Sequence, residues 1–258
     1  MKKEIEAFLD YLSVDKRFSE NTIDAYKNDL SQLADFFQGQ GEGKQWAEVD
    51  RQLILSYLLD LKERGYALAT IARKTASMKS MFKFLVNTGV LENAPTENLS
   101  SPRVRKTIPQ PLSVAQVREL LKQPEKHTTP EAKRDKAMLE LLYASGMRVM
   151  ELMKLNLEDI NRQEGSVACL VKGSKERNIV IPRDSVPSLG KYLEEARPQL
   201  ANRKEERALF LNRLGNRLTR QGFWQILKSY ARESKLDTQA TLRSLRHSSA
   251  AHMLSRGS

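Results

Sequence analysis

The chain has 258 residues, of which 40% are hydrophobic and 29% are charged, enough for one or two domains with their own cores. Cys169 is the only cysteine, and the three histidines lack metal-ligand spacing, so we expect no disulfide framework, zinc site or cofactor. No apolar run approaches the roughly 18 residues that span a bilayer, and residues 1–13 do not resemble a signal peptide. These features predict a soluble cytoplasmic protein without a membrane partner.

The charge of the chain is distributed unevenly. Its formal net charge is +11, yet residues 1–105 hold as many acidic as basic side chains, so the whole surplus lies in residues 106–258. A surplus of this size favours a polyanionic partner, because each phosphate that a protein neutralises releases counterions. A basic surface without a partner remains the alternative.

Residues 1–95 have the periodicity of helices joined by short polar turns. Residues 1–13 form an amphipathic pattern, and residues 22–37, preceded by Ser19 and Asn21, place apolar side chains at helical spacing. Residues 51–65 predict a further helix that ends at Gly65, a typical C-terminal cap residue.

Residues 68–89 predict a helix with two contrasting faces. The opposite faces consist of Ile71, Met78, Met81, Phe82 and Leu85 on one side, and Arg73, Ala76, Lys79, Ser80 and Lys83 on the other. A face of small residues and cations without an acid could lie close to a phosphate backbone. A solvated lysine face is the alternative explanation.

A proline-rich stretch divides the chain. Residues 94–112 contain four prolines and no apolar periodicity, and we expect a linker over residues 101–112 between domains 1–100 and 113–258. Its cations Arg103, Arg105 and Lys106 could follow a nucleic acid between the domains. Ser113 then opens a helix, with Gln116 at the capping-box position.

The second domain contains the only strand signals. Two β-rich runs, 166–171 and 178–182, flank a turn that carries Lys172, Gly173, Ser174 and Lys175, and helices resume from about Val186. The predicted fold class is therefore mainly α: two domains, the second with a small antiparallel β-sheet.

Arg148 follows a turn at Gly146 and lies within an apolar stretch, where we expect it to be buried. A buried unpaired charge is costly, so the guanidinium requires an anion. Both Glu151 and a phosphate of a ligand satisfy that requirement, and the two are compatible.

Arg243 and Arg246 lie three residues apart and therefore on one helical face, beside His247. This arrangement indicates an anion-binding site, although a solvent-exposed basic helix end would have the same sequence.

Several stretches, in order, resemble the tyrosine recombinase or phage-integrase family, over nearly the whole chain. SENTIDAYKNDLSQLADFF and TIARKTASMKSMFKFLVNTGVLENAPTENL are similar to its N-terminal SAM-like, DNA-clamping domain. LLYASGMRVMELMKLNLEDI resembles the first arginine motif, VKGSKERNIVIP the lysine hairpin, LFLNRLGNRLTRQGFW a segment preceding the second arginine motif, and TLRSLRHSSAAHMLSRG that motif itself.

The resemblance implies site-specific recombination through a 3′-phosphotyrosyl intermediate on double-stranded DNA. Arg148 and Arg246 would hold the phosphate, Lys172 would protonate the leaving 5′-oxygen, and Glu151 and His247 would support the site. Contacts to DNA are expected from the following cations and serine: Arg73, Lys79, Ser80, Lys83, Arg103, Arg105, Lys106, Lys175, Arg177 and Arg220. Other recombinase protomers are implied partners, two on one site and four in a synapse, with a nucleoid location.

The sequence departs from the family pattern in two places. Arg243 stands where the family usually has histidine, and a permanently charged arginine stabilises a phosphorane but cannot act as a base. The residues after Arg246 end before any late tyrosine, and Tyr143, Tyr192 and Tyr230 have core-type spacing. We therefore expect an incomplete catalytic domain that binds DNA without cutting it. A non-catalytic DNA-binding accessory protein and a topoisomerase IB-like enzyme are the alternatives.

Overall fold

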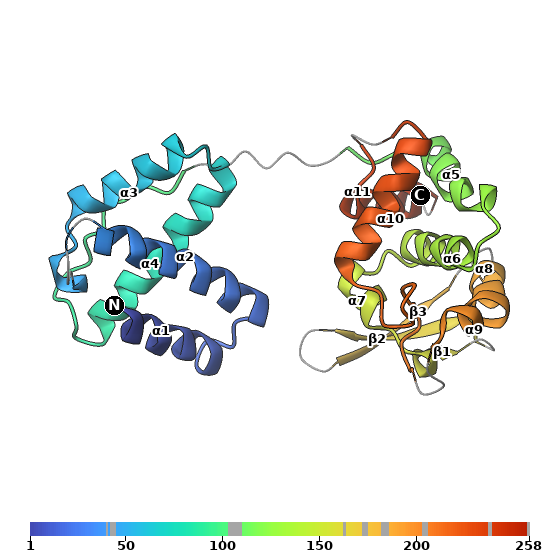
Figure 1. Ribbon diagram of the computed structural model, residues 1–258, viewed down its shortest axis with the longest axis horizontal. Coiled ribbons are helices and arrows are strands. Elements are labelled where there is room, and N and C mark those ends of the chain that lie inside the picture. Colours follow the sequence, from blue (N-terminus) through green and yellow to red (C-terminus); the bar gives the residue numbers. More distant parts are fainter. Residues whose placement is uncertain are drawn as a thin grey trace. The chain divides into compact units, whose positions relative to one another are not determined.

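The computed structural model describes residues 1–39, 41, 45–102, 110–161, 164–171, 175–181, 186–202, 206–236 and 239–256. The chain divides into two compact units, Met1–Thr107 and Ile108–Ser258. The two units are coloured blue to green and green to red in Figure 1. Each has a hydrophobic core of its own.

The N-terminal unit is helical throughout its described secondary structure. It consists of α1 (Lys2–Val14), α2 (Glu20–Gly39), a 3₁₀ turn (Trp46–Glu48), α3 (Arg51–Glu63) and α4 (Leu68–Asn87). Helix α2 packs against α1, α3 and α4. The apolar face predicted for α4 is confirmed, because all five of its side chains are at most 3% exposed. These side chains fill the core between the helices.

Local signals in the sequence begin and end several helices. The Asp50 side chain accepts a hydrogen bond from the Leu53 amide and caps α3, and Gly65 adopts φ +73° just after that helix. At the start of the second unit, the Ser113 hydroxyl accepts from the Gln116 amide, and the Gln116 side chain accepts from the Ser113 amide. The predicted capping box is therefore confirmed.

The C-terminal unit is built around helix α6 (Pro130–Ser145), which packs against most of the other helices of the unit. The other helices are α5 (Val114–Lys122), α7 (Val149–Lys154), α8 (Val186–Lys191), α9 (Arg197–Leu200), α10 (Arg220–Glu233) and α11 (Leu242–Arg256). One π-helical turn (Tyr192–Ala196) joins α8 to α9, and 3₁₀ turns span Gln123–Lys126 and Leu157–Asp159. The fold is mainly α, as predicted.

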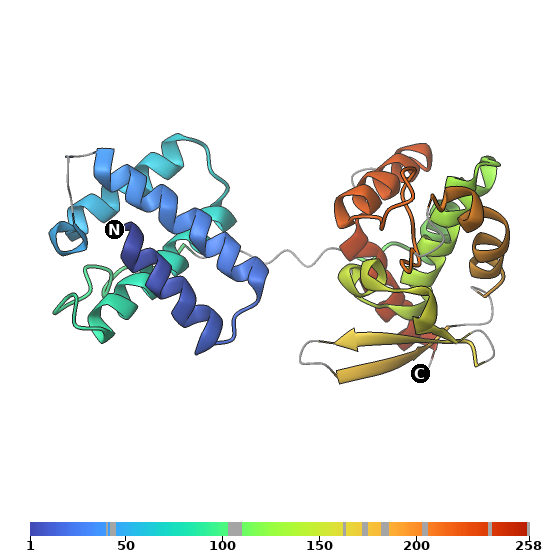
Figure 2. The same cartoon turned by 60° about the horizontal axis from the view of Figure 1, so that its bottom comes forward.

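A small antiparallel sheet completes the C-terminal unit (Figure 2). Its strands, in the order β1–β2–β3, are Ile160–Asn161, Ser166–Val171 and Lys175–Val180. The predicted start of the last strand at Asn178 was wrong, because Lys175 already pairs with Val171 in the ladder. Lys175 is thus a strand residue, and Lys172 lies outside the described residues.

Both ends of the proline-rich stretch pack against the unit next to them. Lys79 Nζ donates to the Leu99 carbonyl oxygen at 2.8 Å in the N-terminal unit. Leu112 is 2% exposed in the second core, and its amide donates to Ser248 Oγ at 2.7 Å. Arg103, Arg105 and Lys106 lie outside the described residues.

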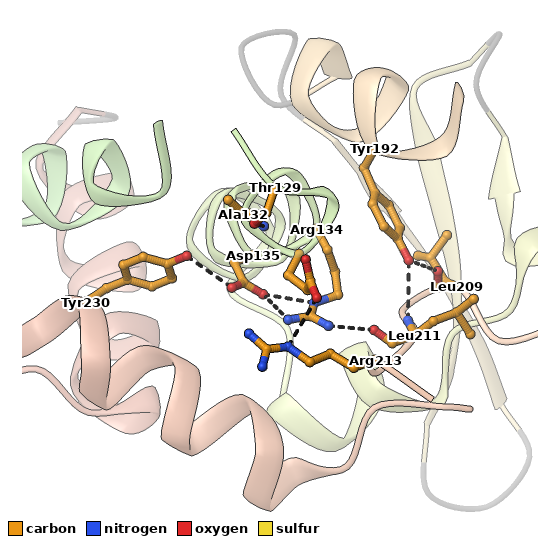
Figure 3. A network of polar contacts seen from close by, with 10 residues as sticks. Thr129, Ala132, Arg134, Asp135, Tyr192, Leu209, Leu211, Arg213 and Tyr230 are labelled. Carbon is orange, nitrogen blue, oxygen red and sulfur yellow. Dashed lines mark hydrogen bonds and ion pairs between the residues drawn. The ribbon is translucent and has the colours of Figure 1, made fainter. Parts of the chain in front are cut away.

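A buried ion pair connects α6 with α10 and with the segment before α10 (Figure 3). Arg134 Nε and Nη2 donate to Asp135 Oδ1 at 2.9 and 2.7 Å, and Arg134 Nη1 donates to the Leu211 carbonyl at 2.8 Å. The Tyr230 hydroxyl donates to Asp135 Oδ2 at 3.1 Å. This network joins three segments that are distant in sequence.

We expect Asp135→Asn to destabilise the C-terminal unit by about 3–5 kcal/mol, because it leaves the Arg134 charge buried without a counter-ion. The unfolding transition of this unit in urea measures the effect. Glu158→Gln is the matched control, since Glu158 pairs with Arg207 at the surface, and it should leave the midpoint unchanged. Equal midpoints for the two variants would contradict a structural role for the buried pair.

Candidate phosphate-binding site

The C-terminal helix meets the turn between α6 and α7. Arg246 Nε donates to the Gly146 carbonyl oxygen at 2.8 Å, although 100 positions separate the two residues in the chain. Gly146 ends α6, and Arg148 begins α7 two residues later. The packing thus places the two arginines that the sequence predicted as a pair at the same turn, and Nη1 and Nη2 of Arg246 take no part in this bond.

Glycine is favoured at the centre of this contact. Gly146 adopts φ +59°, in the left-handed region, and a Cβ atom there would lie 3.3 Å from Ser249 Oγ on α11. A larger residue would therefore strain the backbone and press against the helix that carries Arg246.

Arg148 is exposed, so the prediction that it is buried was wrong. Its side chain is 59% exposed, whereas the side chain of Glu151 is 8% exposed. The reason is local: Arg148 is the N-cap of α7, with φ −72° and ψ 145°, so the helical periodicity of its apolar neighbours does not apply to it. The turn presents the guanidinium to solvent.

The predicted pairing of Arg148 with Glu151 is confirmed. Glu151 Oε2 accepts from the Arg148 backbone amide at 2.6 Å, and Oε1 accepts from Arg148 Nη1 at 3.0 Å. A second arginine approaches the same carboxylate, since Arg177 Nη2 on β3 lies 3.8 Å from Oε2. One buried carboxylate therefore serves two exposed arginines.

The remaining predicted residues of the second arginine motif lie on α11. Arg243 is exposed, and Arg246 and His247 are half-buried. Arg243 lies in the first turn of a 15-residue helix, whose positive dipole end favours anions, although the Ser244 amide is already bonded to Thr241 Oγ1. With Arg148 and Arg246 at one turn, the arrangement suits a bound phosphate oxyanion.

The three tyrosines of the C-terminal unit have structural contacts. The Tyr192 hydroxyl donates to the Leu209 carbonyl at 2.9 Å, and burial raises the pKa of Tyr192 to about 12. Tyr230 is bonded to Asp135, and burial together with the Asp135 charge raises its pKa as well. The Tyr143 hydroxyl lies 2.8 Å from His252 Nδ1. Core-type placement of Tyr192 and Tyr230 is confirmed, and Tyr143 is half-buried.

The predicted basic face of α4 is less free than its sequence suggests. Arg73 pairs with Asp29 of α2, and Lys79 bonds the Leu99 carbonyl oxygen. Lys83 is exposed and Ser80 is half-buried. The residues of the face include no acid, as predicted, but helix packing brings the buried Asp29 carboxylate of α2 to Arg73.

The sequence-based prediction missed the buried Lys74 and the helical neighbours of the predicted Arg220 on α10, Trp224 and Lys228. Lys74 is 3% exposed and its Nζ lies 3.1 Å from Asp29 Oδ1, which ties α4 to α2. On α10, exposed Arg220 is followed at helical spacing by Trp224, which is 41% exposed with Lys228 Nζ 5.4 Å from its ring centroid. The spacing of residues 220, 224 and 228 could have predicted this cationic and aromatic stripe.

Within the described ranges, no helix is long and apolar enough to cross a membrane. The same residues contain no group of three or more acidic, histidine or cysteine side chains able to hold a metal ion.

The chain is mainly helical, has two compact units, and in the second of them brings two arginines to one turn. Residues 110–258 match the phage integrase family model, and residues 5–89 match the model of the phage integrase N-terminal SAM-like domain. The chain belongs to the phage integrase family, that is, to the tyrosine recombinases of the XerC and XerD type.

Similar proteins cover the whole length of the chain. It is 47% identical over 257 residues to tyrosine recombinase XerC of Herpetosiphon aurantiacus, covering 100% of this chain and 83% of that protein. It is 39% identical to tyrosine recombinase XerD of Oceanobacillus iheyensis, covering 98% of this chain and 85% of that one.

Solved structures share the fold at low sequence identity. XerH site-specific recombinase bound to palindromic difH substrate, in a post-cleavage complex, has a TM-score of 0.73 at 18% identity, covering 98% of this chain and 84% of that chain. A lambda integrase dimer bound to a COC′ core site has a TM-score of 0.73 at 13% identity, covering 97% and 88% of the two chains.

Proposed function

We propose that the protein binds a duplex recombination site and acts in site-specific strand exchange through a 3′-phosphotyrosyl intermediate. The observation that carries the proposal is the bond from Arg246 to the Gly146 carbonyl, because it brings the second arginine to the turn that presents the first. Two guanidiniums at one point match the non-bridging oxygens of a phosphate in the transition state. Family membership supports the same chemistry.

The proposed reaction is a transesterification. A tyrosine hydroxyl attacks the scissile phosphorus and releases its proton to solvent, the bond to the 5′-oxygen breaks, and Lys172 supplies the proton that the leaving oxygen needs. Arg148, Arg246 and Arg243 stabilise the charge of the phosphorane. Reversal by a 5′-hydroxyl of a partner duplex joins the exchanged strand, so no external energy source is required.

The nucleophile of this proposal is not one of the C-terminal unit's tyrosines within residues 1–258. Tyr192 and Tyr230 are buried and hydrogen-bonded, and Tyr143 contacts His252. We therefore propose that residues 1–258 bind the site, with Lys175, Arg220 and the α4 cations contacting its backbone. Cleavage would need a tyrosine supplied by further C-terminal residues, and partner protomers would complete the synapse.

The test has two stages. The 258-residue chain selects its duplex from a random library, and we expect a defined site rather than a uniform population. The extended chain, defined here as residues 1–258 continued by the C-terminal segment of a tyrosine recombinase with its nucleophile, then reacts with a nicked form of that site.

We expect a covalent protein–DNA adduct that is lost in Arg148→Ala. Site-specific binding without an adduct would instead favour a non-catalytic accessory protein. Relaxation of supercoiled DNA without strand exchange would favour a topoisomerase-like enzyme.

A further inference from the structure

Glu151 is a buried carboxylate that two exposed arginines share. Its side chain is 8% exposed, whereas those of Arg148 and Arg177 are 59% and 55% exposed. Oε1 accepts from Arg148 Nη1 at 3.0 Å, and Oε2 accepts from the Arg148 amide at 2.6 Å. Arg177 Nη2 lies 3.8 Å from the same Oε2.

Strand β3 holds Arg177 in this place. Arg177 is directly opposite Cys169 of β2 in the antiparallel ladder, and directly opposite residues share one face of a sheet. Helix α7, which carries Glu151, packs against β2. The buried Cys169 thiol reflects this neighbourhood: its pKa is raised to about 11, chiefly by burial and then by the Glu151 charge, while Arg177 opposes the rise.

The charges of this cluster limit what Arg148 can do alone. A desolvated carboxylate needs compensating cations, and if Arg148 were its only partner, Glu151 would neutralise the charge of Arg148. Arg177, a second cation beside Oε2, compensates part of the carboxylate's charge. Arg148 then keeps positive charge for a phosphate while its guanidinium stays oriented by Oε1.

We propose that Arg177 is a positioning residue for the phosphate site: from β3 it anchors Glu151, and through Glu151 it orients Arg148 and frees its charge. The inference rests on the proposed function. It differs from the prediction made from the sequence, in which Arg177 contacts the DNA backbone directly. The two roles differ in one measurable respect, because only the positioning role requires Glu151.

The experiment uses the 258-residue chain and the duplex it selects. Single phosphates of that duplex are replaced, one at a time, by neutral methylphosphonates, and the affinity for each is compared with that for the unmodified duplex. We expect one position where the loss is about 10- to 100-fold, the range for hydrogen bonds to a charged group. Arg148→Gln should abolish that loss and so identifies the phosphate that Arg148 holds.

At this phosphate, the fall in affinity caused by the methylphosphonate should be about tenfold smaller for Arg177→Gln than for the wild-type chain. Arg177→Lys should show most of the wild-type fall, because lysine can also pair with Glu151. Arg207→Gln is the matched control, since Arg207 pairs at the surface with Glu158 and belongs to no proposed site. It should lower affinity at most uniformly and keep the full loss at the one position. Thermal unfolding of each variant checks that the fold is retained.

A double-mutant cycle with Glu151→Gln then separates the two roles. The proposal expects Arg177→Gln to have little further effect once Glu151 has lost its charge. Additive effects, or an Arg177→Gln variant that keeps the full position-specific loss, would overturn it in favour of direct backbone contact. If no single methylphosphonate lowers the affinity of the wild-type chain more than the others, the proposed phosphate-binding site itself is overturned, and this result is distinguishable from failure of the Arg177 proposal.

Discussion

Lys172→Ala is expected to slow strand cleavage by the extended chain by about 10²–10⁴-fold, the usual contribution of general acid catalysis. The 5′-oxygen leaves as an alkoxide unless a proton reaches it, and an alanine supplies none. DNA affinity should be almost unchanged, because one lysine among many cations contributes little to total phosphate neutralisation. Single-turnover cleavage at saturating protein measures the chemical step.

A substrate with a bridging 5′-phosphorothiolate provides the decisive control. Its sulfur leaving group needs no proton, so Lys172→Ala should cleave it nearly as fast as the parent extended chain does. The matched variant is Arg177→Gln, whose proposed defect lies in phosphate binding and which the sulfur should not rescue. If the sulfur substrate fails to rescue Lys172→Ala, the lysine acts in binding rather than in proton transfer.

The arginines of α11 should have the second large effect. We expect Arg246→Ala to lower the cleavage rate of the extended chain on the order of 10³-fold or more, and Arg243→Ala about 10²–10³-fold. Arg246 loses more because its side chain also bonds the Gly146 carbonyl and so joins α11 to the turn before Arg148. Within the described residues, the Arg243 side chain makes no contact of this kind with another element, and it is exposed.

Conservative variants test the charge of Arg243. Arg243→Lys should keep part of the activity, and Arg243→His should be active with a new pH dependence near neutrality, because histidine loses its charge there. Arg232→Ala, at the exposed end of α10, is the control and should cleave at the parent rate. A parent rate for Arg243→Ala at saturating DNA, with only a salt-sensitive loss of affinity, would remove Arg243 from the site.

Features of short range could be predicted from the sequence. The apolar face of α4, the capping box at Ser113 and the β2 strand all depend on residues a few positions apart. Periodicity and capping act within one element, so the order of residues determines them. The family motifs predicted the candidate arginines and the mainly helical fold on the same local basis.

The sequence was less informative about the environment of individual charged residues. Arg148 was expected in the core because its neighbours are apolar, yet it is a helix cap and points to solvent. The cationic face of α4 was expected to be free for a phosphate backbone, yet α2 pairs Asp29 with its Arg73. For Asp29 the deciding contact comes from another helix and is absent from the local pattern, whereas for Arg148 the deciding feature is its own cap position at the start of α7.

The residues of the candidate site were thus identified by the sequence alone, but their geometry was decided by tertiary structure. Arg246 reaches Gly146 only because α11 packs against α6, where Gly146 has no Cβ to press against Ser249. Arg177 reaches Glu151 only because β2 packs against α7. Contacts between residues far apart in the chain arise from burying apolar faces of separate elements, and no local spacing encodes them.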